Sequence, residues 1–140
     1  MRERRFPSSL AFLAVLVLLS IGAALAGGLT LYVQTRVKNE TQAETMTAGH
    51  VAHGHALIVG YGCGSCHVIP GVDGANGKVG PDLTGIAKRA AIAGSLSNDP
   101  DTMVRWLKHP QALRPGSGMP EMGISDPTAR DIAAYLYARS

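Results

Sequence analysis

Two cysteines followed directly by a histidine constrain this chain more than any other feature. The segment CGSCH at residues 63–67 has the C-x-x-C-H spacing of a c-type haem attachment site. In a short helical turn, residues three apart lie on the same side, so both sulfurs can form thioethers with the haem vinyl groups. His67 can then offer its imidazole to the iron as an axial ligand. The motif predicts one covalently bound haem c, held by Cys63, Cys66 and His67.

Other interpretations of the two cysteines fit the chain less well. A thioredoxin-like redox pair belongs in a βαβ context, and no β-rich stretch precedes Cys63. A structural zinc site uses four Cys or His ligands, whereas the chain has only two cysteines. A plain disulfide would not require the histidine that follows Cys66.

The N-terminal region contains 24 consecutive uncharged residues, mostly apolar, at positions 10–33. A membrane-spanning helix needs about 20 residues, and Arg2, Arg4 and Arg5 before the run mark the cytoplasmic side. We therefore expect residues 1–9 to be cytoplasmic and residues 10–33 to form a single transmembrane anchor. In a bacterium, the rest of the chain would face the periplasm from the inner membrane.

A cleaved signal peptide is the alternative for this segment. Ala24-Leu25-Ala26 fits the small-residue cleavage pattern, although the apolar run continues beyond it. Both interpretations export the remainder of the chain. Residues 34–47 are polar without a clear apolar stripe, so we expect a linker between the anchor and a domain at 48–140.

The domain at 48–140 has eight Lys/Arg and seven Asp/Glu residues. This balance argues against nucleic-acid binding, which usually requires a clustered basic face. The chain's overall net charge of +3 owes much to its first five residues.

Helical signals recur along this domain. Apolar spacing predicts a helix within 48–61 and a short one over 82–91. Asp99-Pro100 and Asp126-Pro127 each supply an N-cap and a first-turn proline, which predicts helices from about 100 to 109 and from 126 onward. The glycine-rich residues 68–80 are expected to form a loop. The domain is predicted to be all-α.

A sixth iron ligand is expected from a methionine, because thioether sulfur there raises the reduction potential. Met119 lies in a segment rich in proline and glycine at 113–120, where a loop can turn one side chain toward a haem without helical constraint. Met122 is the main alternative, followed by His109. Met103 completes the apolar face of its helix and is expected to pack in the core.

Three histidines, His50, His53 and His55, also invite a metal-site interpretation. No cysteine or carboxylate accompanies them in the sequence. We expect them to be solvated or packing residues.

With these features in place, the chain resembles a class I cytochrome c. More narrowly, it resembles the cytochrome c domain fused to subunit II of some bacterial haem–copper oxidases. The matching segments cover most of residues 60–138 and are GCGSCHVIPG, GKVGPDLTGIAKR, NDPDTMVRWLKHPQALRPGSGMP and ARDIAAYLY. The resemblance implies a class I cytochrome c fold around one covalent haem, with the last helix crossing the first near Gly54.

The resemblance also implies roles for residues beyond the ligands. The carbonyl of Pro81 would accept a hydrogen bond from the proximal imidazole, which fixes the ring and raises its basicity. Arg89 would pair with a haem propionate. Trp106 would pack beside the propionate edge, or it is an ordinary core anchor at helical spacing.

The function expected on these grounds is single-electron transfer by a non-enzymatic, membrane-anchored haem protein. It would accept electrons from a quinol-oxidising complex or a periplasmic dehydrogenase and pass them to a terminal oxidase or reductase of a respiratory chain. A fixed haem subunit of a larger membrane-bound oxidase or dehydrogenase is one alternative. A sensor or small-molecule enzyme with an open iron site is another, and it requires that Met119 is not a ligand.

Overall fold

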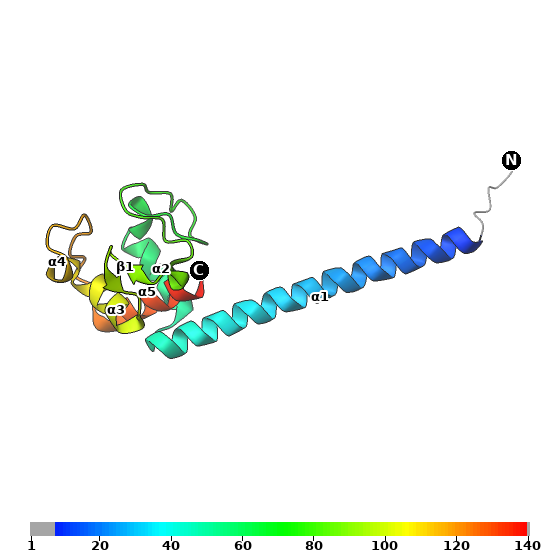
Figure 1. The fold of residues 1–140 in the computed structure, drawn as a ribbon, viewed down its shortest axis with the longest axis horizontal. Coiled ribbons are helices and arrows are strands. Elements are labelled where there is room, and N and C mark those ends of the chain that lie inside the picture. The colour runs from blue at the N-terminus through cyan, green and yellow to red at the C-terminus, as the bar shows by residue number, and fades with distance from the viewer. Residues whose placement is uncertain (1–7, 140) are drawn as a thin grey trace. The chain divides into compact units, whose positions relative to one another are not determined.

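The computed structural model describes residues 8–139 and divides the chain into two compact units that adjoin between Arg36 and Val37. Arg2, Arg4 and Arg5, on which the predicted cytoplasmic side depends, lie outside the described residues. The helices are α1 (Ser8–Thr47), α2 (Val51–Gly60), α3 (Pro100–Lys108), α4 (Pro110–Leu113) and α5 (Asp126–Ala138) (Figure 1). Short 3₁₀ turns, η1 (Cys63–Ser65) and η2 (Ile86–Lys88), and a small hairpin, β1 (Ala91–Ile92) with β2 (Leu96–Ser97), complete the elements.

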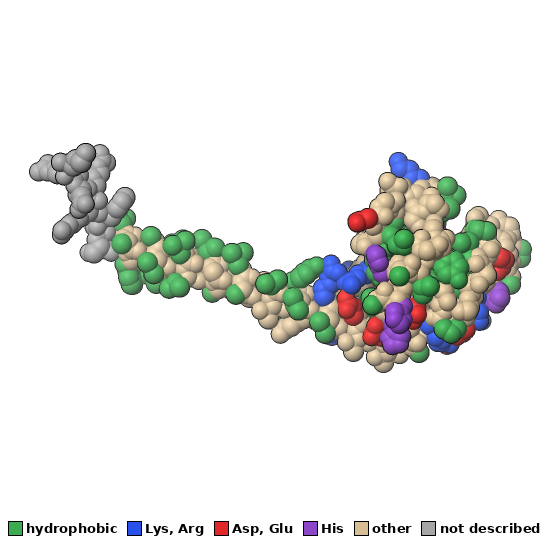
Figure 2. Space-filling model, turned by 180° about the vertical axis from the view of Figure 1, so that it is seen from behind, with side chains coloured by type: hydrophobic (Ala, Val, Ile, Leu, Met, Phe, Trp, Pro, Cys, Tyr) green, Lys and Arg blue, Asp and Glu red, His purple; other side chains and the backbone are tan. Residues whose placement is uncertain are grey.

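The first unit consists of the N-terminal part of α1. Its apolar side chains are exposed, and Figure 2 shows hydrophobic groups along the visible face of this stretch. Among the described residues, α1 alone is long and apolar enough to cross a membrane, a property that signal sequences share. The guanidinium of Arg36 lies 5.1 Å from the ring centroid of Tyr32, where the apolar run gives way to charge.

The last turns of α1, residues 37–47, belong to the second unit. Ala43 and Thr47 are buried, and Glu40 Oε1 lies 2.8 Å from Arg139 Nη2. We expected a linker over 34–47 and a domain beginning at residue 48, whereas residues 37–47 are grouped with the second unit. The buried contacts are made by small side chains, which leave no apolar stripe in the sequence.

Helices α2 and α5 cross at close range and form the centre of the second unit. A Cβ at Gly54 would lie 2.8 Å from the Cβ of Tyr135 and would collide with the carbonyl of Asp131. The expected crossing of the last helix near Gly54 is therefore present. Ile58 from α2 and Ile132 from α5 are almost fully buried beside it.

Side-chain caps fix the start of α3 and α5. Asp99 Oδ1 accepts a hydrogen bond of 2.9 Å from the backbone N–H of Thr102, as the sequence predicts. The predicted cap of α5, Asp126, instead lies in its first turn, and Ser125 is the N-cap, with Pro127 following. A helix can begin one residue earlier here because the serine hydroxyl accepts from Thr128.

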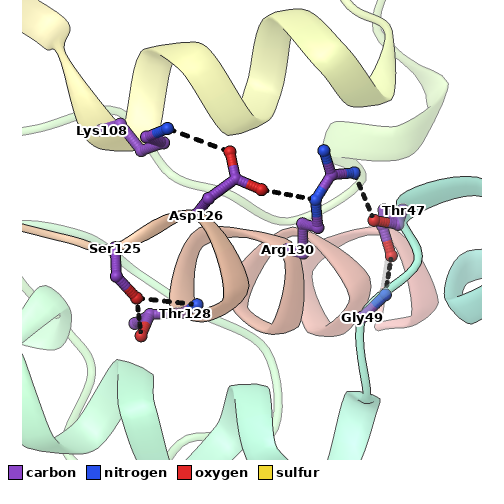
Figure 3. Close-up of polar contacts among 7 residues, drawn as sticks. All are labelled: Thr47, Gly49, Lys108, Ser125, Asp126, Thr128 and Arg130. Carbon is purple, nitrogen blue, oxygen red and sulfur yellow. Dashed lines mark hydrogen bonds and ion pairs between the residues drawn. The ribbon is translucent and has the colours of Figure 1, made fainter.

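Asp126 links the start of α5 to α3 and pairs with Arg130 one turn further along its own helix (Figure 3). Its carboxylate lies 2.9 Å from Lys108 Nζ at the end of α3 and 2.7 Å from Arg130 Nε. Hydrogen bonds from Lys108 and Arg130 hold the pKa of Asp126 below its usual value. Arg130 also donates to the carbonyl of Thr47, 3.1 Å away, which joins the end of α1 to α5.

The predicted helix over 82–91 is wrong. Only the turn η2 forms there, because Gly85 takes a left-handed backbone conformation with φ of 68° that interrupts a helix. The chain then enters the hairpin of β1 and β2, which the sequence analysis missed. Pro110 ends α3 as expected, yet it also begins the short helix α4.

Candidate functional site

The C-x-x-C-H segment forms the expected short helical turn. The backbone N–H groups of Cys66 and His67 donate to the carbonyl of Cys63 over 3.2 and 3.0 Å. Both cysteines are free and partly buried. Burial raises the pKa of the Cys63 thiol, and the neighbouring Cys66 adds to the effect.

Three glycine contacts pack the following loop against this turn. A Cβ at Gly64 would lie 2.8 Å from the Cβ of Ala75, and one at Gly77 would collide with the backbone of Cys66. Gly80 lies against the imidazole of His67, where a Cβ would be 2.6 Å from Nδ1 and 2.8 Å from Nε2. The sequence predicted only a loop over residues 68–80, without the contacts that Gly77 and Gly80 make with the C-x-x-C-H turn and its histidine.

The imidazole of His67 is held by a second contact. Its Nδ1 lies 2.7 Å from the carbonyl oxygen of Pro81, which can only accept, so Nδ1 carries the proton. The hydrogen bond expected from the family resemblance is thus present. It leaves Nε2 as the nitrogen with a lone pair for a metal.

A cavity of about 680 Å³ opens beside His67 and falls within the size range of cofactor pockets. Its lining includes both cysteines, His67, Met119, Met122, Arg89 and Trp106. Apolar side chains complete it, among them Ile58, Ile69, Met103, Leu107, Ile132 and Leu136. The structure therefore brings together in one cavity the site residues predicted from distant parts of the sequence.

The candidates for a second axial ligand separate into two groups. Met119 and Met122 are half-buried and line the cavity, whereas His109 is not among its lining residues. His109 Nδ1 instead lies 3.7 Å from Glu121 Oε2. Met103 lines the cavity but is only 2% exposed within the core, in agreement with the packing role expected from its helix.

Arg89 and Trp106 lie at the cavity as the resemblance implies, with differences in detail. The Nη2 atom of Arg89 donates to the carbonyls of Asp82 and Thr84, over 2.6 and 2.8 Å. The guanidinium of Arg89 therefore stabilises the loop before η2 through these hydrogen bonds, and the residue also lines the cavity. Trp106 is half-buried, lines the cavity and packs against the core, while its packing beside a propionate stays a prediction.

Of the three histidines near the start of α2, His50 and His53 lie edge to face with their ring centroids 5.2 Å apart. His50 Nδ1 lies 4.0 Å from Glu44, His53 Nδ1 lies 3.5 Å from Asp131, and His55 packs against the ring of Tyr135. The folded chain thus places one carboxylate beside His50 and another beside His53. Within residues 8–139, no group of three or more His, Cys, Asp or Glu side chains could hold a metal ion.

The donor set fits a haem c. The cavity is mostly apolar, as a porphyrin requires, and its wall presents two thiols three residues apart for thioether bonds. His67 Nε2 and a methionine sulfur would hold the iron. Arg89 and Trp106 offer polar contacts for propionates.

Comparisons with known proteins agree with this geometry. The family model described as cytochrome c matches residues 51–139. A cytochrome c2 of Rhodopila globiformis is 36% identical over 87 residues, which covers 53% of this chain and 79% of that protein. A cytochrome c oxidase subunit 2 of Alkalihalophilus pseudofirmus is 33% identical over 75 residues, again 53% of this chain but only 21% of that protein. No solved structure matches the chain.

Proposed function

Because the chain belongs to the cytochrome c family, we propose that it is a monohaem electron carrier with iron ligands His67 and Met119. The family implies haem c, and Cys63 and Cys66 would attach it covalently. The observation that carries the proposal is the meeting of both cysteines, His67 and Met119 in one cavity.

When bound, the haem supplies an iron that exchanges one electron at a time between its ferrous and ferric states. The chain's own residues bind and orient it. Pro81 and Gly80 hold the His67 ring in one plane and one tautomer. Apolar side chains of α2, α3 and α5 exclude water from the cavity, which limits reorganisation when the charge changes.

We further propose that residues 10–33 anchor the protein in a bacterial inner membrane, with the haem domain on the periplasmic side. The apolar part of α1 supports an anchor. Quinol-oxidising complexes or periplasmic dehydrogenases would be donors, and terminal oxidases or reductases would be acceptors. An anchored carrier would share the membrane with both, which raises its effective concentration at each.

The similarity to an oxidase subunit 2 favours one alternative, a fixed haem subunit of a larger membrane complex. Mild solubilisation of the full-length protein from its membrane distinguishes the carrier from the fixed subunit. A carrier is recovered as a single chain, whereas a fixed subunit is recovered with its partner subunits.

The proposed function is tested on the full-length protein produced with a cytochrome c maturation system. We expect haem to stay on the wild-type chain in a denaturing gel and to be lost from a Cys63→Ser, Cys66→Ser double variant. We also expect a one-electron redox titration and no rapid binding of carbon monoxide to the reduced protein. Rapid binding would instead indicate an open iron site.

A further inference from the structure

Gln111 makes an unusual number of contacts with the loop that carries Met119. Its Nε2 lies 2.6 Å from the carbonyl of Met119, 2.8 Å from that of Ser117 and 3.0 Å from the hydroxyl of Ser117. Its Oε1 accepts a 3.1 Å hydrogen bond from the backbone N–H of Gly116. One side-chain amide therefore uses both its donor and its acceptor end on residues 116–119.

The backbone of Gln111 also binds the same loop beyond Pro120. Its N–H donates to the Glu121 carboxylate over 3.0 Å. Gln111 therefore binds the loop on both sides of Pro120: residues 116–119 before it and Glu121 after it. A hydrogen-bonded frame of this kind restricts where the Met119 side chain can lie.

Other contacts also hold the start of the loop, where the N–H of Ser117 donates to the carbonyl of Arg114 over 3.1 Å and the hydroxyl of Ser117 lies 3.4 Å from the Met119 carbonyl. The loop is otherwise irregular. It has no helix or strand between Leu113 and Asp126, and Gly116 has a positive φ of 79°. A Cβ at Gly118 would meet nothing within 4 Å. The residue before Gln111, Pro110 at the start of α4, is almost fully buried, which fixes the position of the Gln111 backbone.

We propose that Gln111 is the positioning residue that holds the Met119 thioether in place as an axial iron ligand. This inference rests on the proposed function, because it presupposes a haem in the cavity. Gln111 does not touch the iron. Its amide fixes the carbonyl of Met119 and so limits the distance over which the sulfur can withdraw.

Two substitutions test this in the full-length haem protein. Gln111→Leu removes the polar amide at similar size, and Gln111→Glu keeps length and polarity but replaces the donor with a carboxylate that repels the two carbonyls. The control is Asp99→Ala, which removes the cap of α3 and destabilises the domain without touching the loop. The measurements are the methionine–iron charge-transfer band and the rate at which added imidazole displaces the methionine in the ferric protein.

We expect both Gln111 variants to exchange the methionine about tenfold faster or more, the size expected from losing two or three hydrogen bonds. Asp99→Ala should unfold more easily but exchange at the wild-type rate. Wild-type exchange in either folded Gln111 variant, or equal acceleration in Asp99→Ala, would overturn the inference. So would failure of both Gln111 variants to fold, because a positioning role leaves the fold intact.

The outcome for the proposed function is read separately, from the wild-type protein. If wild type lacks the charge-transfer band, methionine ligation itself fails, whatever Gln111 does. If wild type has the band and the Gln111 variants behave like it, only the positioning role fails.

Discussion

The two sides of the cavity are held by different means. On the His67 side, glycines pack closely against their neighbours, with Gly64 on Ala75, Gly77 on the backbone of Cys66 and Gly80 on the imidazole. On the Met119 side, an irregular loop is held by the hydrogen bonds of one half-buried glutamine. Close packing tolerates almost no added atom, whereas a hydrogen-bonded loop can shift by small amounts. The histidine ligand is therefore expected to be the rigid one and the methionine ligand the exchangeable one.

The largest expected contrast comes from matched glycine substitutions on the two sides. Gly80→Ala should destabilise the haem protein by about 1–3 kcal/mol, because the new methyl group must displace the His67 ring. Gly118→Ala should change stability by less than about 1 kcal/mol, since its Cβ meets nothing. Chemical denaturation and the yield of haem-loaded protein measure both. Equal effects on the two sides would remove the contrast.

An intermediate effect is expected from Asp126→Asn, which touches neither ligand. The pKa of Asp126 is lowered by Lys108 and Arg130, so its charged form stabilises the fold at neutral pH. That stability is present above the unfolded value of 3.8 and is lost as the pH falls through the lower folded value.

The melting temperature of wild type should therefore exceed that of Asp126→Asn at pH 7, and the gap should close as the pH falls below about 3.8. The optical spectrum should be the same in both proteins. A gap that persists in acid, or a spectral change, would show that Asp126 acts in another way.

The smallest effect should follow Ser117→Ala on the Met119 side. It removes a hydroxyl that lies 3.0 Å from the Gln111 amide nitrogen and 3.4 Å from the Met119 carbonyl, and it leaves the carbonyls of Ser117 and Met119 in place. We expect methionine exchange to accelerate by less than about threefold, because the Gln111 amide keeps its hydrogen bonds to both carbonyls and the hydroxyl's contact with the Met119 carbonyl is long, at 3.4 Å. If Ser117→Ala accelerated methionine exchange as much as Gln111→Leu does, the serine hydroxyl rather than the glutamine amide would be the group that holds the loop.

Local signals in the sequence predicted the parts of the fold that local chemistry decides. The cap and proline at Asp99-Pro100 located α3 within a residue, and the CGSCH segment formed its turn. The short helix over 82–91 failed because a single left-handed residue, Gly85, outweighs the helical tendency of its neighbours. Beside Gly85, the guanidinium of Arg89 binds the carbonyls of Asp82 and Thr84, contacts that form only in the folded loop.

The site shows the same division. The cysteines, His67 and Met119 were predicted because their spacing or their loop marks them in the sequence, and all four line one cavity. Gly80 and Gln111 were missed because their roles depend on contacts between segments that meet only after folding. A glycine against a ring and a glutamine under a loop look like ordinary residues in the linear chain.

The most direct test of the central claim compares the ferric spectra of Met119→Ala and Met122→Ala in the full-length haem protein. Both methionines line the cavity, so the pair is closely matched. We predict that Met119→Ala loses the methionine–iron charge-transfer band and that Met122→Ala keeps it. A band that survives in Met119→Ala, or disappears in Met122→Ala, would contradict the assignment of His67 and Met119 as the two iron ligands.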